Sequence, residues 1–262
     1  MPGRRSLLFL GCGTSVGVPM IGCDCPVCTS RDPKNNRTRS SVLVTLPGGR
    51  LLIDTTPEMR IQFLRERIPL AHAVLYTHYH ADHLFGLDDV RLFPRRLGTP
   101  LPLYCTKEVE AVVRGTFGYA FQPANANLPA GVVPKLEFRT ITPTEPFEAL
   151  GQTITPVPLV HGRFDVLGFR FNTVAYCTDV SRIPDASWPL LENLDVLVLD
   201  ALKPGTPNPA HFSLDEALAA IERLKPRQAY LTHMGHEMDY DRLIRELPAG
   251  VSPAHDGLQF EF

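Results

Sequence analysis

Short apolar runs alternate with polar turns along the chain, and most of these runs are rich in β-branched or aromatic residues. Runs of this length and composition predict strands, at residues 7–10, 42–45, 51–54, 73–77, 103–105, 166–171, 174–178, 196–200 and 229–232. Pro47-Gly48-Gly49 separates two of these runs as a hairpin turn does. The N-terminal part of the chain is therefore predicted to be antiparallel.

Helical patterns follow three of the turns, at residues 58–67, 107–114 and 214–224. Ser213, with Glu216 three places on, has the form of a capping box at the start of the last helix. Hairpins early and strand–helix alternation later predict an α/β layered sandwich with helices outside. No repeat or charge run marks a linker, so we expect a single domain over residues 1–262, with residues 122–134 as a flexible insertion.

Composition and charge narrow the function. The chain has 262 residues, of which 44% are hydrophobic, enough for a full buried core. A formal charge of -2 provides no excess of positive charge to hold a long polyanion, so no stable nucleic-acid complex is expected. The apolar run after Arg5 meets Gly11 too early for a signal peptide or a membrane span. We therefore expect a cytoplasmic protein with no membrane partner.

The densest chemical signal is Thr77-His78-Tyr79-His80-Ala81-Asp82-His83, which follows an apolar strand and opens into a helical segment. Alternation on an extended segment puts His78 and His80 on one side, and the turn into the helix can bring Asp82 and His83 to a second point nearby. Imidazole and carboxylate together suit Zn²⁺, Mn²⁺ or Fe. The alternative is a solvated polar loop. We favour the metal site, because burial of this cluster without metal would desolvate several polar groups.

This H-x-H-x-D-H pattern resembles the metal-binding signature of the metallo-β-lactamase superfamily. The resemblance implies an αββα four-layer sandwich and extends to His161, Asp179 and His233, each at the end of an apolar stretch. It also implies a two-metal site. The implied ligands are His78, His80 and His161 for one divalent ion, Asp82, His83 and His233 for the other, and Asp179 between them.

The six cysteines fall unevenly along the chain. Three are scattered in apolar surroundings, where free cysteine is usually a buried small hydrophobe: Cys12, Cys105 and Cys177. Cys23, Cys25 and Cys28 instead share one turn-rich stretch, residues 22–28, and in a reducing compartment such a cluster suggests metal. A turn after His233 could point His236 toward this loop and complete a closed Cys₃His structural zinc site. The alternative is three unligated surface thiols.

The stretch from Gly11 to Pro19 and the cysteine loop resemble one branch of the superfamily, the phosphoribosyl 1,2-cyclic phosphate phosphodiesterases of phosphonate breakdown. A similar cysteine loop occurs in the pyrroloquinoline-quinone biosynthesis protein B family, which does not keep the full H-x-H-x-D-H set. The resemblance to the phosphodiesterases implies hydrolysis of a small phosphodiester. Related enzymes are often dimers, so the resemblance leaves a homodimer open, and the sequence does not determine the oligomeric state.

His211 stands just before the Ser213 helix start, in a stretch punctuated by prolines. A loop mounted on a helix N-terminus suits a proton donor or a phosphate contact, although a helix-capping or surface role is also open. Asp82 and His211 are accordingly the candidate catalytic residues. Arg37 and Arg39 either contact a substrate phosphate or lie on the surface of a solvated turn. We favour the second alternative.

The function predicted from these patterns is hydrolysis of a small phosphodiester by a water that two divalent ions, Zn²⁺ or Mn²⁺, activate. A cyclic phosphate of ribose is the leading substrate and a cyclic nucleotide follows. The first alternative is an RNA 3′-processing nuclease, although no glycine- and basic-rich arm for transfer RNA stands out in the sequence. The second is a non-catalytic metal-binding or carrier protein of the same fold.

Overall fold

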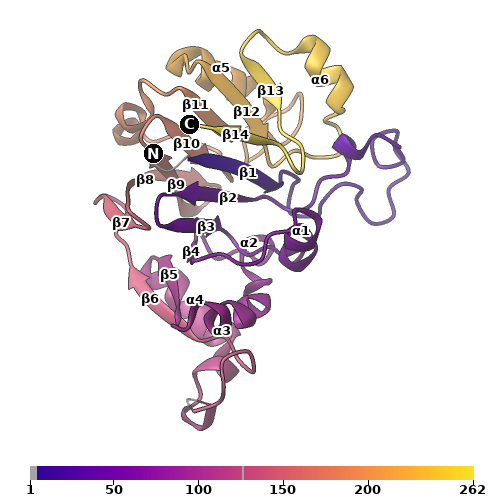
Figure 1. The fold of residues 1–262 in the computed structure, drawn as a ribbon. Coiled ribbons are helices and arrows are strands. Elements are labelled where there is room, and N and C mark those ends of the chain that lie inside the picture. The colour runs from indigo at the N-terminus through magenta and orange to yellow at the C-terminus, as the bar shows by residue number, and fades with distance from the viewer. Residues whose placement is uncertain (1–4, 126) are drawn as a thin grey trace.

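The computed structural model describes residues 5–125 and 127–262, in which two sheets lie face to face (Figure 1). The first sheet comprises β1 (Ser6–Gly11), β2 (Ser41–Leu46), β3 (Gly49–Ile53), β4 (Ala73–Leu75), β5 (Leu101–Cys105), β6 (Leu136–Thr140) and β14 (Gln259–Glu261). The second comprises β7 (Phe147–Ala149), β8 (Gln152–His161), β9 (Phe164–Phe171), β10 (Val174–Cys177), β11 (Val196–Asp200), β12 (Gln228–Thr232) and β13 (Val251–Pro253).

Both sheets are mixed. The first has the order β14-β1-β2-β3-β4-β5-β6, antiparallel from β14 to β3 and parallel from β3 to β6. The second has the order β13-β12-β11-β10-β9-β8-β7, parallel from β13 to β10 and antiparallel from β10 to β7. Leu46 pairs with Gly49 across a tight turn, so the predicted early hairpin is confirmed.

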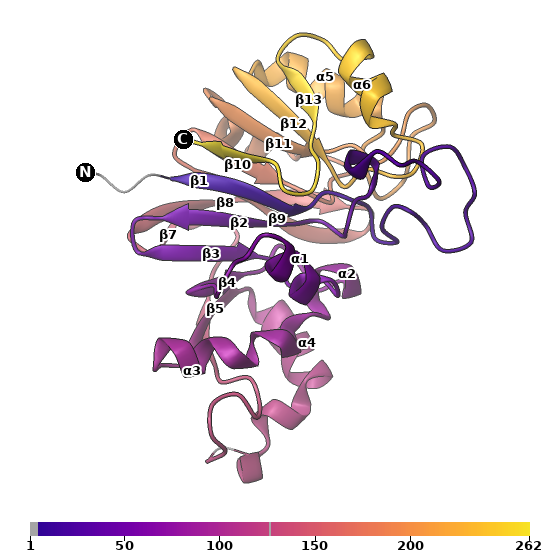
Figure 2. The ribbon, with the colours of Figure 1, turned by 45° about the vertical axis from the view of Figure 1, so that its right-hand side comes forward.

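Helices cover the outer face of each sheet (Figure 2). Those beside the first sheet are α1 (Met59–Arg65), α2 (Ala81–Leu84), α3 (Phe93–Leu97) and α4 (Lys107–Thr116), and those beside the second are α5 (Leu214–Leu224) and α6 (Tyr240–Glu246). Five 3-10 helices are also described: η1 (Pro33–Asn35), η2 (Leu87–Leu92), η3 (Gly118–Phe121), η4 (Pro123–Asn125) and η5 (Asp185–Leu191).

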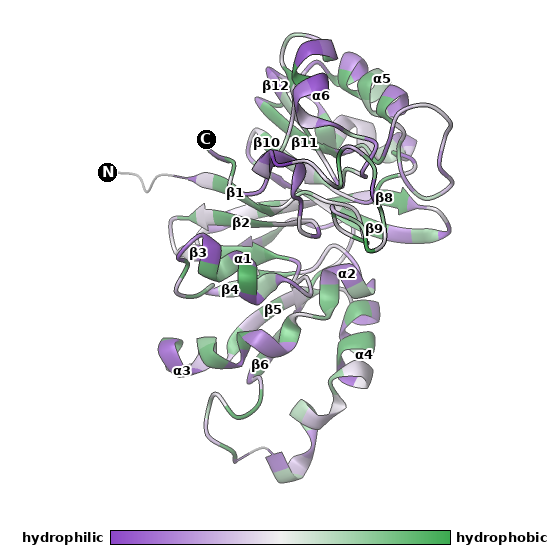
Figure 3. Ribbon diagram, turned by 90° about the vertical axis from the view of Figure 1, so that its right-hand side faces the viewer, coloured by the Kyte–Doolittle hydropathy of each residue, from purple (hydrophilic) through white to green (hydrophobic). Residues whose placement is uncertain are grey.

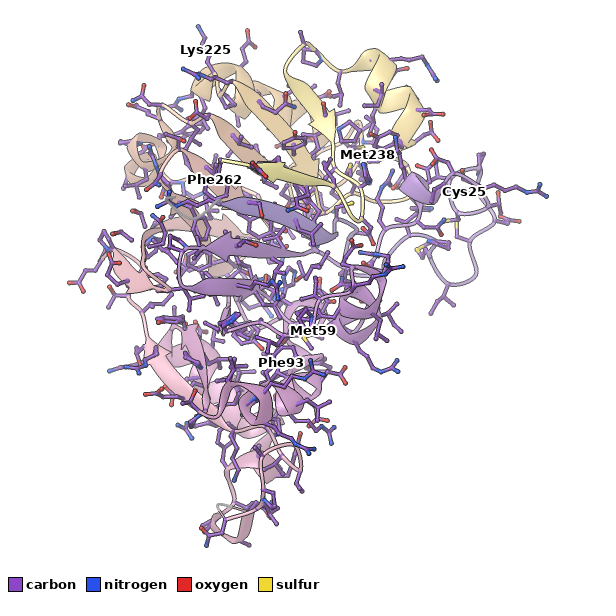
Figure 4. The ribbon with its side chains drawn as sticks, viewed as in Figure 1. Cys25, Met59, Phe93, Lys225, Met238 and Phe262 are labelled. Atoms are coloured by element: carbon purple, nitrogen blue, oxygen red, sulfur yellow. The ribbon has the colours of Figure 1, made fainter. Side chains whose placement is uncertain are left out.

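The period-2 alternation along the strands creates these layers. In β3, Leu51 and Ile53 belong to the core shared with the second sheet, whereas Leu52 belongs to the core under the helices. Met59 and Phe93, labelled in Figure 4, belong to the same helix-side core as Leu52. Hydrophobic colour accordingly runs along the central strands in Figure 3. The predicted αββα four-layer sandwich of one domain is confirmed.

Local signals located some elements better than others. The helix at residues 214–224 has the predicted bounds, and Ser213 and Glu216 form the predicted capping box. β8 was not predicted, because Pro156 and Pro158 interrupt the run and proline cannot donate to a sheet ladder. The structure accommodates these prolines because β7 pairs only with residues 152–154, and the next backbone bridge on β8 apart from its pairing with β9 is at Val160, which pairs with Arg182.

Parts of two sequence predictions lie outside the described residues. Residues 1–4 belong to the N-terminal stretch that the signal-peptide argument concerned, and residue 126 belongs to the expected insertion at 122–134. Around residue 126, the segment contains η4 and extends below β6 in Figure 1. Within the described part of the chain, no helix has the length and apolar character needed to cross a bilayer.

The inter-sheet core should dominate stability. Ile154 on β8 is fully buried, so Ile154→Ala should lower the free energy of unfolding by about 2–5 kcal/mol. The same change at Ile244, which is 50% exposed on α6, should shift it by less than about 0.5 kcal/mol. Urea unfolding followed by circular dichroism measures both values. Equal effects of the two substitutions would contradict this assignment of the core.

Candidate metal centre

Strand ends from both sheets meet at one edge of the sandwich and carry histidines and carboxylates. His78 and His80 follow β4, His161 is the last residue of β8, and His233 directly follows β12. Their ligand atoms form two groups, each within 4.8 Å: His78, His80, His161 and Asp179, and Asp82, His83, Asp179 and His233. The structure therefore brings together the seven active-site residues that the sequence singled out as metal ligands.

Asp179 belongs to both groups. One of its carboxylate oxygens lies 3.2 Å from Nε2 of His83, and the other lies 3.5 Å from Nε2 of His233 and 3.7 Å from Nε2 of His161. The residue is 1% exposed and has a left-handed backbone with φ of 57°. A non-glycine residue rarely adopts this conformation unless its surroundings impose it. The carboxylate thus stands between the two groups, where a bridging ligand would be needed.

Unpartnered nitrogen atoms show that this donor set fits metal ions. Nε2 of His78, His83 and His233 is buried and forms no hydrogen bond among the described residues, although Asp179 oxygens lie 3.2–3.9 Å away. Leaving such atoms unsatisfied in a protein interior costs free energy. Neutral imidazole nitrogens and carboxylates at these separations suit divalent ions such as Zn²⁺ or Mn²⁺. Coordination of cations would satisfy the three nitrogens together.

Hydrogen bonds from the opposite ring nitrogens orient several of these histidines. Nδ1 of His83 lies 2.8 Å from Oδ2 of Asp54, and Nδ1 of His161 lies 2.6 Å from the carbonyl oxygen of Ala210. If each Nδ1 carries the proton, each Nε2 is free to act as a ligand. Such partners determine both the tautomer and the direction of the ring.

Asp54 was not singled out by the sequence analysis. It is fully buried, has a left-handed φ of 63°, and accepts hydrogen bonds from the backbone N–H and the hydroxyl of Thr77 at 2.9 and 2.8 Å. Together with its contact to His83, these bonds tie the end of β3 to the ligand loop after β4. The available signal was an acid that ends an apolar strand run, residues 51–54.

The carboxylates give this edge of the sandwich a strong attraction for positive charge. Burial opposes charge on His83 and His233, but the neighbouring carboxylates, chiefly Asp179, raise the pKa of His83 well above its usual value and that of His233 to about 9. Burial instead lowers the pKa of His78 and His161. Because cations and protons compete for the same nitrogens, metal binding here should weaken at low pH.

His211 also lies at this centre. Its ring stacks on His233 with centroids 4.5 Å apart, and its Nδ1 lies 2.8 Å from Oδ2 of Asp200. Ser213, and not His211, caps α5, so the helix-capping alternative for His211 is wrong. Asp200, fully buried at the end of β11, also accepts the N–H of Val180 at 2.7 Å and was missed by the sequence analysis.

The cysteine loop forms a separate cluster on a segment that projects from the sandwich, where Figure 4 labels Cys25. The ligand atoms of Cys23, Cys25, Cys28 and His236 lie within 4.8 Å of one another, with Nδ1 of His236 3.2 Å from the Cys23 sulfur. Hydrogen bonds, first from the N–H of Cys28, lower the pKa of the Cys25 thiol to about 6. All six cysteines lie in the described part of the chain and are free, so this cluster is not a disulfide.

Arg37 corrects one expectation. It was expected on a solvated turn, but it is 1% exposed and donates hydrogen bonds to the carbonyl oxygens of Gly235 and Met238. A buried guanidinium needs such acceptors, so Arg37 ties the N-terminal loop to the segment after His233. Arg39 binds Glu58 and the carbonyl oxygen of Ser15.

The four-layer sandwich, with histidines and carboxylates gathered at one edge, is characteristic of the metallo-β-lactamase fold. Residues 49–234 match the family model described as "Beta-lactamase superfamily domain". The chain belongs to this family.

Several curated proteins are similar to this chain. An octanoyltransferase of Porphyromonas gingivalis is 32% identical over 254 residues, which cover 96% of this chain and 50% of the relative. A coenzyme PQQ synthesis protein B of Methylobacterium radiotolerans is 30% identical over 171 residues, which cover 58% of this chain and 52% of the relative. The chain thus spans about half the length of these relatives.

Solved structures share the fold along the whole chain. One described as a new diphosphatase from the PhnP family is 44% identical, with a TM-score of 0.91 over 100% of this chain and 98% of that one. Zn²⁺-bound PqqB from Methylobacterium extorquens is 21% identical, with a TM-score of 0.78 over 98% and 100%. Human tRNase Z, short form, is 17% identical, with a TM-score of 0.69 over 97% and 98%. The last two likenesses concern the fold alone.

Asp54 offers a direct test of how the centre is held. Asp54→Asn removes a carboxylate acceptor from Nδ1 of His83, so the affinity for divalent ions should fall by about 10- to 100-fold. Competition with a chelator, read by elemental analysis of the recovered protein, measures the affinity. Asp195→Asn, at an exposed ion pair with Arg227, is the matched control. Unchanged affinity in Asp54→Asn would refute the orienting role.

Proposed function

We propose that this chain is a metal-dependent phosphodiesterase that hydrolyses a small phosphodiester, with a cyclic phosphate of ribose as leading substrate and a cyclic nucleotide as the next. The observation that carries the proposal is the convergence of seven buried or half-buried ligand residues with His211 at one edge of the sandwich. The likeness to a PhnP-family diphosphatase, at 44% identity, supports chemistry at phosphorus.

The proposal includes three ions. Two divalent ions, Zn²⁺ or Mn²⁺, would be held by the two residue groups that share Asp179, and a structural Zn²⁺ would be held by the cysteine loop and His236. When bound, the two active-site ions would lower the pKa of a water to supply hydroxide near neutral pH and would offset the negative charge on the phosphoryl oxygens. Asp82 is proposed to take part in catalysis as a metal ligand, in the group with His83, Asp179 and His233.

The chain's own residues handle the leaving group. With the Nδ1 proton of His211 directed to the Asp200 carboxylate, Nε2 is the nitrogen left to deliver a proton to the departing oxygen. Asp200 keeps the ring in place, as a buried carboxylate does for an imidazole in other hydrolases. The stacking of His211 on His233 and its tilted ring contact with His161 further limit its motion.

A second candidate is hydrolysis of a diphosphate bond. It differs only in the leaving group, a phosphate in place of an alcohol, and the description of the 44% identical structure favours it. RNA 3′-processing has less support, because the likeness to tRNase Z concerns the fold and the chain carries a formal charge of -2. The carrier alternative would be favoured only by metal-loaded protein that turns over none of these substrates.

Hydrolysis of bis-p-nitrophenyl phosphate and of a ribose cyclic phosphate tests the proposal. Asp179→Ala should abolish turnover of both, because it removes the carboxylate common to both ligand groups. His211→Ala should slow hydrolysis of the ribose cyclic phosphate by about 100- to 10,000-fold, because the departing alkoxide needs a proton. The same variant should slow hydrolysis of the p-nitrophenyl ester far less, because p-nitrophenolate departs without taking up a proton.

Asp195→Ala, remote from the ligand groups, is the control for folding and metal loading in this series. Equal losses on both substrates in His211→Ala would count against a proton donor and leave the phosphodiesterase intact. No turnover by the wild-type protein with Zn²⁺, Mn²⁺ or Fe would overturn the proposed function itself.

The zinc proposed for the cysteine loop should be removable separately from the ions of the active site. Cys25→Ser and His236→Ala should each remove one zinc per chain and lower the melting temperature, because the projecting segment then loses its cross-link to the 233–236 turn. Elemental analysis and thermal unfolding measure the two effects. His255→Ala, whose side chain is outside all of the ligand groups, should change neither. An unchanged zinc count in both loop variants would disprove the structural zinc site.

A further inference from the structure

A pocket of about 710 Å³ adjoins the candidate metal centre, and the proposed chemistry leaves it unused. Its wall is formed by the ligand loop after β4, the start of α4, residues 140–144 after β6, and parts of β8 and β9. β4, β5 and β6 are parallel, so their carboxyl ends, and the segments that follow them, share one edge of the sheet. The pocket therefore continues the edge on which the metal ligands lie.

The connection between pocket and centre runs through the ligand loop itself. His78 and Tyr79 both line the pocket. The Tyr79 ring also makes an edge contact with the ring of His80 at 5.8 Å and with that of Phe164 at 6.1 Å. Tyr79 is thus a wall shared by the pocket and the ligand groups, and a molecule bound at the centre could extend past it.

The pocket has an apolar floor and a polar rim. Buried Val109, Ile141 and Leu167 contribute to the floor, and threonine hydroxyls such as that of Thr142 contribute to the rim. This combination suits a flat organic ring, since the ring faces can be buried while the edges meet hydroxyl donors and acceptors. The volume lies within the usual range of roughly 300–1,000 Å³ for small-molecule sites.

Charge limits what the occupant can be. Besides His78 and Tyr79, the ionisable residues that line the pocket within the described chain are Lys107, Glu108 and Asp165. One cation against two carboxylates offers no net attraction for a second phosphate. An uncharged group is therefore favoured over a phosphorylated one.

We propose that this pocket binds an uncharged, nucleobase-sized ring attached to the phosphoryl group that reacts at the metal centre. The inference rests on the proposed function and reverses the order of its two substrates: a nucleoside carrying a cyclic phosphate or a diphosphate is preferred over a cyclic phosphate of ribose, which has no base. The pocket would select substrates by binding their ring, while the metal centre would act only on the phosphoryl group.

Equilibrium binding tests the pocket without turnover. Calorimetry on the metal-loaded protein compares adenosine 5′-monophosphate with ribose 5-phosphate, which differ by the base. The wild-type protein should bind the adenosine compound at least about tenfold more tightly, a difference of roughly 1.4 kcal/mol. Thr142→Trp, which fills the rim, should remove that difference and leave ribose 5-phosphate affinity within about twofold. Thr153→Trp, at an exposed site on β8, is the matched control.

Equal affinities of the wild-type protein for the two compounds, or a preference that survives Thr142→Trp, would overturn the pocket assignment. The proposed function is judged separately, by wild-type turnover of glycerol 1,2-cyclic phosphate, which has no ring to bind. Turnover of that ester without a preference for the adenosine compound would reject the pocket alone. A preference for the adenosine compound without turnover of any phosphodiester would reject the proposed function alone.

Discussion

The buried carboxylate of Asp179 is the constraint on which the centre depends. It is 1% exposed, yet the positive character of His83 and His233 around it holds its pKa well below the usual range, so it stays ionised. An unpaired buried charge would destabilise the fold, and the surrounding imidazoles or bound cations are what offset it. The two ligand groups therefore share one electrostatic requirement and are best regarded as a single centre.

Strain in the backbone accompanies this arrangement. Asp54, Asp179 and His233 all have left-handed φ values, from 57° to 63°, although none is glycine. Each stands directly after a strand or one residue beyond it, where the chain must turn sharply so that the side chain faces the centre. Such conformations cost free energy and persist only when surrounding contacts impose them. The sandwich core and the hydrogen bonds of Asp54 and Asp200 provide those contacts.

The segment from His233 to His236 links the two candidate metal sites. His233 belongs to the centre and His236 to the cysteine cluster, while Gly235 between them accepts a hydrogen bond from buried Arg37. The N–H of Met234 also donates to the carbonyl oxygen of Cys12. The projecting cysteine loop is therefore connected to the backbone that positions His233, and the two sites share mechanical support.

Local pattern in the sequence determined much of this protein. Apolar runs predicted strands near β2, β3, β10, β11 and β12, and the Ser213 capping box located α5, because strand period and helix caps depend on residues close together in the chain. The H-x-H-x-D-H stretch predicted a metal site because its four potential ligands also lie close together in the chain. The resemblance it carried, rather than spacing alone, pointed to distant His161, Asp179 and His233.

Only the tertiary structure decided the rest, because it depends on contacts between residues far apart in sequence. β8 exists despite two prolines, since β9 pairs with its residues 155–161. Asp54 and Asp200 have roles because the fold places His83 and His211 against them, 29 and 11 residues away. Arg37 is buried for the same reason, with acceptors about 200 residues along the chain. The pattern of neighbouring residues carries no information about partners so far away in the chain, so it could not predict them.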